Sequence, residues 1–150
     1  MKTIAALLPI MFLYSSVSAQ AVPAEVKRAV TNAVVESYSR FFVTEARLIK
    51  CEEGNPSQEF IHKYNPKKVY CATCRNTLIG KDDPSRGKTI RSIISVIAIA
   101  TQSGEVEILC GNCPGLNYDW MSSGAAGKKF LELYRSIWRR NCPYPYPDSE

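Results

Sequence analysis

Four of the six cysteines form two Cys-x-x-Cys pairs, and this spacing is the strongest chemical signal in the chain. Cys71 is paired with Cys74, and Cys110 with Cys113, each where a predicted strand runs into a turn. Two such pairs resemble the knuckles of a zinc ribbon, in which four thiolates hold one tetrahedral ion. A thioredoxin-type redox role is a third reading, but it needs a helix that begins at the first cysteine. Neither pair leads into a predicted helix.

Disulfide bonds are the main alternative for the same residues, because the cysteine count is even and the chain has an export signal, described below. The predicted disulfide cysteines are Cys51, Cys71, Cys74, Cys110, Cys113 and Cys142. In this reading three bridges form and no cofactor is needed. In the zinc-site interpretation the ion is held by four cysteines, Cys71, Cys74, Cys110 and Cys113, and one disulfide bond remains. The spacing does not give the connectivity, since six cysteines allow 15 pairings.

His62 is the only histidine, which removes mechanisms that need two imidazoles. No Gly-x-Ser-x-Gly element frames a serine nucleophile. His62 could act with Glu59 and an arginine as the acid–base pair of a one-histidine secreted ribonuclease. A surface histidine in a polar stretch explains the same residues without chemistry, so the sequence assigns no catalytic residue and predicts a non-enzymatic protein.

A basic face and an aromatic tail near the C-terminus make the best predicted partner-binding surface. Lys128, Arg135 and Arg139 lie together on one face of a predicted helix, and Tyr144 and Tyr146 alternate with prolines in the tail that follows. Tyrosine and arginine are enriched at binding hot spots. We predict that residues 143–150 form a flexible, polyproline-like tail.

Residues 1–19 have the pattern of a secretion signal: a positive Lys2, an apolar core over 4–14, and the small-residue site Val17-Ser18-Ala19. Residues 20–150 are then one secreted domain. The apolar core of the signal is shorter than the ~20 residues of a membrane span, and no later stretch is longer. The net charge of +5 suits many partners, whereas dedicated nucleic-acid binders carry denser basic patches.

The apolar spacing predicts an α+β fold in which an antiparallel sheet packs with an N-terminal and a C-terminal helix and is stapled by disulfides. The predicted helices span 24–39 and 123–140, with 40–50 favoured as a continuation of the first helix. The predicted strands span 60–64, 69–71, 89–101 and 105–110. The last two form a hairpin expected at the centre of the sheet, and 80–88 reads as a surface loop.

In format the whole chain resembles fungal small secreted cysteine-rich effectors: an export signal, one small domain, an even cysteine count and no catalytic signature. Trp138-Arg139-Arg140-Asn141 is similar to the Trp-Arg-x-Arg element of one avirulence group, with Asn at its fourth position. The resemblance implies an extracellular monomer, which could be delivered into host cells and binds a host protein to affect virulence. A secreted ribonuclease-like enzyme or RNA-binding protein is the alternative, and a zinc-ribbon binding module is the third reading.

Overall fold

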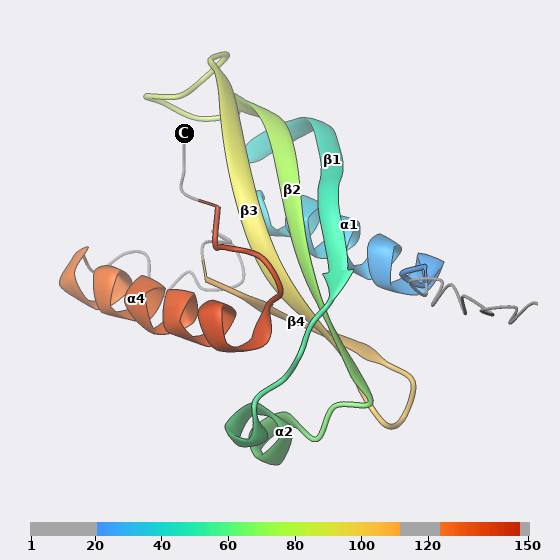
Figure 1. Cartoon of the computed structure of the whole chain (residues 1–150). Helices are drawn as coiled ribbons and strands as arrows, with labels where there is room; N and C mark the ends of the chain where they lie inside the picture. Colours follow the sequence, from blue (N-terminus) through green and yellow to red (C-terminus); the bar gives the residue numbers. More distant parts are fainter. Residues whose placement is uncertain (1–20, 112–123, 148–150) are drawn as a thin grey trace, which may run out of the picture.

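The computed structural model describes residues 21–111 and 124–147, which form a four-stranded antiparallel sheet with helices on both faces (Figure 1). The predicted signal, Cys113 and residues 148–150 lie outside the described part. The strand order is β1-β2-β3-β4, so every strand pairs with its neighbour in sequence. The elements are α1 (Ala24–Ser37), β1 (Phe41–Glu53), α2 (Gln58–Tyr64), β2 (Lys68–Gly80), β3 (Thr89–Ala100), β4 (Val106–Cys110) and α4 (Gly124–Asn141). The predicted α+β class with two flanking helices is confirmed.

Helix α1 covers one face of the sheet through the predicted valine stripe. Val26, Val30 and Val34 recur every four residues and are fully buried, and Tyr38 just after the helix is buried as well. They pack on the side chains that β2 and β3 turn toward this face, among them Ala72. The helix therefore forms because its apolar residues fall on one side, where burial stabilises them.

Helix α4 covers part of the opposite face. Its Tyr134 and Trp138 pack against Cys71, Ile97 and Ile99, which project from β2 and β3 on that side. Residues 94–99 of β3 are buried without a break because helices cover both faces there.

The prediction that the first helix continues over 40–50 is wrong, because these residues belong to the edge strand β1. Register shifts interrupt its pairing with β2 between Val43 and Glu45 and between Leu48 and Lys50. Each shift adds a residue, so the half-buried positions fall at steps of two and three instead of two. This mixed spacing does not show the strict alternation of a strand and therefore favours a helical interpretation of the sequence.

The predicted strand over 60–64 is also wrong, because the segment forms the short helix α2. Ser57 caps its first turn, with Oγ accepting a hydrogen bond from the Phe60 backbone N–H at 3.3 Å. Asn65 ends the helix in the left-handed conformation at φ 43°. Local capping therefore outweighs the β-propensity of Phe60 and Ile61.

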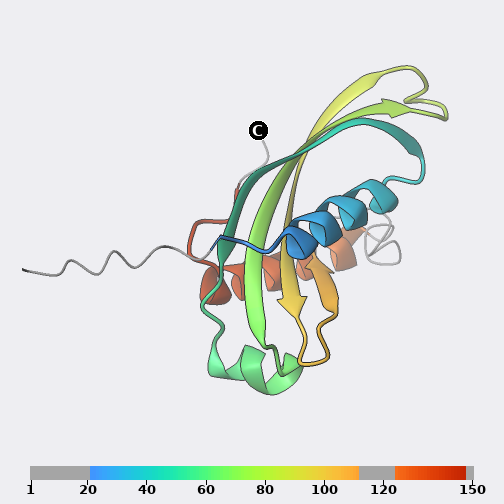
Figure 2. The same cartoon turned by 90° about the vertical axis from the view of Figure 1, so that its right-hand side faces the viewer.

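The centre of the sheet is the β2–β3 pair, so of the hairpin predicted there only β3 is central, whereas β4 is an edge strand. β2 runs over 13 residues, far beyond the predicted 69–71, and pairs with β3 from Lys68 to Ile79. The predicted strands over 89–101 and 105–110 are otherwise confirmed, as is the loop over 80–88. Figure 2 shows the far ends of β2 and β3 projecting beyond both helices.

Candidate functional site: the C-terminal surface

Two buried aromatic residues fix α4 against the sheet. The Tyr134 hydroxyl donates its single proton to a hydrogen bond shared between the backbone oxygens of Ser95, at 2.9 Å, and Leu109, at 3.2 Å. Burial raises the pKa of Tyr134 well above its ordinary value, so the hydroxyl stays a donor at any physiological pH. Trp138, one turn later, is 0 % exposed. The position of α4 on the sheet is therefore fixed by the hydrogen bond of Tyr134 and by the apolar packing of Trp138.

The segment after α4 folds back over Trp138. A disulfide joins Cys142 to Cys71 on β2, and the Trp138 indole N–H donates to the Tyr144 backbone oxygen at 2.9 Å. The Tyr144 hydroxyl hydrogen-bonds with the Thr73 hydroxyl at 3.2 Å. The Tyr146 ring meets the Trp138 ring edge-on, with centroids 5.6 Å apart. These contacts hold residues 142–146 against the fold, which differs from the flexible tail that the prolines predict.

The five predicted partner-binding residues occupy different environments. Lys128 and Arg139 are exposed on α4. Arg135 is half-buried, with its guanidinium carbon 5.5 Å from the centroid of the Tyr146 ring, in the range of a cation–π contact. Its Nε is buried and makes no hydrogen bond within the described residues. Tyr144 and Tyr146 are half-buried, so their rings act chiefly as packing for Trp138.

Two further residues that hold the C-terminal segment in place come from the sheet and were missed in the sequence. Lys50 of β1 lies with its ammonium 4.2 Å from the centroid of the Tyr144 ring. Thr73 lies directly opposite Lys50 in the pairing of β1 with β2, and it also binds the Tyr144 hydroxyl. Recognising the whole of β2 would have found Thr73, because it shares a face with Cys71 two positions earlier.

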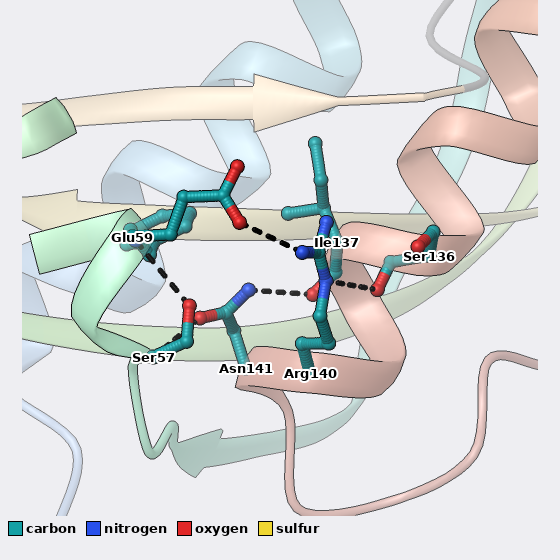
Figure 3. Close-up of polar contacts among 7 residues, drawn as sticks. Ser57, Glu59, Ser136, Ile137, Arg140 and Asn141 are labelled. Carbon is teal, nitrogen blue, oxygen red and sulfur yellow. Dashed lines mark hydrogen bonds and ion pairs between the residues drawn. The ribbon is translucent and has the colours of Figure 1, made fainter.

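Helix α4 ends in a polar junction with α2 (Figure 3). The Asn141 side-chain oxygen accepts from the Ser57 N–H at 2.8 Å, and its amide donates to the Ile137 oxygen at 2.6 Å. Arg140 forms an ion pair with Glu59 at 2.8 Å. A small cleft of about 100 Å³ lies between the two helices and is lined by these groups and by apolar side chains of both.

His62 does not line that cleft. It is exposed on α2, and the carboxylate expected to assist it, Glu59, is engaged with Arg140 instead. Glu59 therefore lies beside an arginine, as the ribonuclease hypothesis requires, but the imidazole of His62 lies outside the cleft between α2 and α4.

The cysteines divide between bridges and thiols. Cys71 is bonded to Cys142, Cys110 is also disulfide-bonded, and Cys51 and Cys74 are free. The two free thiols differ from the predicted complete pairing. Their register explains the difference, because Cys51 lies opposite Ala72 rather than opposite Cys74.

The positions of the cysteines can also be compared with the predicted four-cysteine zinc site. Cys71 and Cys74 are three residues apart on one strand, so they project from opposite faces of the sheet. Cys71 packs in the α4 cluster and Cys74 in the α1 cluster. Cys71 and Cys110 are held in disulfides, and the described residues, which do not include Cys113, contain no group of three or more metal-ligating side chains. Burial raises the pKa of Cys74 to about 11 and also raises that of Cys51, so both thiols are protonated at neutral pH.

Comparisons with family models, with curated proteins and with solved structures found no significant match. Within the described residues, no helix combines the length and the apolar character needed to cross a bilayer.

Proposed function

We propose that the chain is a secreted, non-catalytic interaction protein that acts on a host protein through its C-terminal surface. The C-terminal surface is defined as the exposed face of α4 with Lys128 and Arg139, together with the segment 142–147 that follows. The proposal takes its host context from the resemblance to fungal small secreted effectors.

The observation that carries the proposal is the attachment of the C-terminal segment to the sheet. Cys142 is bonded to Cys71, and the packing of Tyr144 and Tyr146 on Trp138 completes the attachment. A surface that is already ordered loses less conformational entropy when a partner binds. Arg135, held over Tyr146, places a cation between the two exposed ones.

Charge reversal at the two exposed cations tests the proposal. The purified mature protein is infiltrated into leaf tissue, and the defence-linked oxidative burst is measured against dose. Lys128→Glu with Arg139→Glu should raise the half-effective dose at least about tenfold, because charged contacts at an interface govern the association rate. Arg28→Glu with Lys67→Glu is the matched control, since both residues are exposed and neither lies on α4. Equal loss of response in both variants would contradict the proposal.

The ribonuclease-like alternative keeps one supporting observation, the Glu59–Arg140 pair beside a cleft at the helix that carries His62. In that case the protein should cleave a labelled RNA, and His62→Ala should remove the activity, since a general acid–base residue supplies about 10²–10⁴-fold of rate. RNA left intact by the wild-type protein would exclude this alternative.

A further inference from the structure

The half of the sheet beyond α4 has an open face that carries three arginines. Cys71 and Thr73 mark the part of β2 that α4 and the C-terminal segment cover. The next position of β2 on the same face is Arg75, which is exposed and lies directly opposite Arg47 of β1. Arg91 of β3, also exposed, lies one position farther along the same face. Figure 1 shows this half of β1, β2 and β3 above α4.

Two of the arginines are directly opposite each other, and none of the three has a compensating ion pair within the described residues. Directly opposed like charges on neighbouring strands destabilise a sheet, and Arg47 and Arg75 are such a pair. None of the ion pairs formed within the described residues includes any of the three. Within the open half of the sheet, one carboxylate of the described strands, Glu45, shares their face, opposite Thr77. The patch therefore keeps a net positive charge that an anionic partner would neutralise.

An exposed aromatic residue ends the same face. Phe42 lies opposite Ile79, which follows Thr77 on this side of β2, and the Phe42 side chain is 59 % exposed. The Lys81 ammonium lies 4.8 Å from the centroid of its ring. From Thr73 to Ile79 the strand is extended, so the open face is about 20 Å long.

We propose that this arginine face, defined as Arg47, Arg75, Arg91 and Phe42, binds a single strand of nucleic acid. Arginine presents a planar fork that matches phosphate oxygens in a bidentate manner. The exposed ring offers a stacking platform for a base, and stacking on aromatics beside a cationic track is the common mode of single-strand binding. An acidic peptide would use the charges but has no base to stack on Phe42. This surface is distinct from the C-terminal surface, and the inference goes beyond the proposed function.

Fluorescence anisotropy with a labelled 12-nucleotide oligouridylate tests the inference. Arg47→Gln, Arg75→Gln and Arg91→Gln combined should weaken binding more than about thirtyfold. The slope of log K against log salt should fall by about 2, because each of the three arginines that no longer neutralises a phosphate lowers it by about 0.7. Phe42→Ala should weaken binding about tenfold with the slope unchanged, since stacking releases no counterions.

The matched control removes the same charge from other places: Arg28→Gln, Lys63→Gln and Lys67→Gln are exposed positions outside this face. Equal weakening by the control would overturn the inference, because net charge alone would then explain the binding. The same holds if Phe42→Ala has no effect, or if polyglutamate competes as well as unlabelled RNA. No binding at low salt would overturn it directly. Circular dichroism checks each fold, and the single variant Arg75→Gln replaces the triple if that one does not fold.

Discussion

Removal of the Cys71–Cys142 bridge should cost a large part of the stability of this domain. The bridge closes a loop of 71 residues. In the chain-entropy model a loop of that length contributes about 4.4 kcal/mol at 25 °C. Domains of this kind unfold with about 5–15 kcal/mol, so Cys71→Ser with Cys142→Ser should lower the melting temperature by roughly 10–20 °C.

The comparison is best made where Cys51 and Cys74 are already alanine, because free thiols could exchange with the bridge. That background is also the matched control, since it lacks two cysteines but keeps the cross-link. Urea unfolding followed by far-ultraviolet circular dichroism measures the free energy of unfolding of both proteins. A further loss below about 1 kcal/mol would contradict the bridge as the staple that holds α4 to β2.

Three further predictions concern the free thiols, the amide of Asn76 and the hydroxyl of Tyr144. Alkylation in denaturant without reduction should label two thiols per chain, Cys51 and Cys74, whereas in the native protein the buried Cys74 should be protected; no labelling in denaturant would contradict the free thiols. Asn76→Val should raise the free energy of unfolding by about 1–2 kcal/mol in urea titrations, because the fully buried amide of Asn76 makes no well-formed hydrogen bond within the described residues; destabilisation would show that the amide has a partner, such as the Tyr38 hydroxyl, whose pKa Asn76 acts to lower. Burial raises the pKa of Tyr144 from 10.0 to about 12, so the stability that its neutral form contributes is complete below pH 10 and is lost as the pH rises through 12. Tyr144→Phe should flatten that alkaline fall in the urea midpoint, and parallel curves would contradict the assignment.

The long amphipathic helices and the β3–β4 hairpin could be predicted because their signals are local. The valines of α1 repeat every four residues, and the β-branched run of β3 is continuous. The edge strand β1 was missed because its two register shifts disturb the alternation that reveals a strand. Helix α2 was missed because it has only 7 residues and depends on its caps, Ser57 and Asn65.

The candidate site was predictable only on α4. Helical spacing brings Arg135 and Arg139 together, and that part needs no tertiary information. The position of the C-terminal segment depends on tertiary structure, because Tyr144 is held by Thr73 and Trp138. Thr73 of β2 comes near Tyr144 only once the chain has folded. The arginine face was missed for the same reason, since Arg47, Arg75 and Arg91 come from three strands whose register no local pattern specifies.

The half-effective dose of two variants in the leaf assay tests the central claim most directly. One is His62→Ala, which removes the only imidazole. The other is Lys128→Glu with Arg139→Glu, which reverses the charge of the C-terminal surface. If the protein acts by binding through that surface, His62→Ala should match the wild-type dose while the charge reversal requires at least about ten times more protein. Loss of the response in His62→Ala, with the charge-reversed variant fully active, would contradict the account.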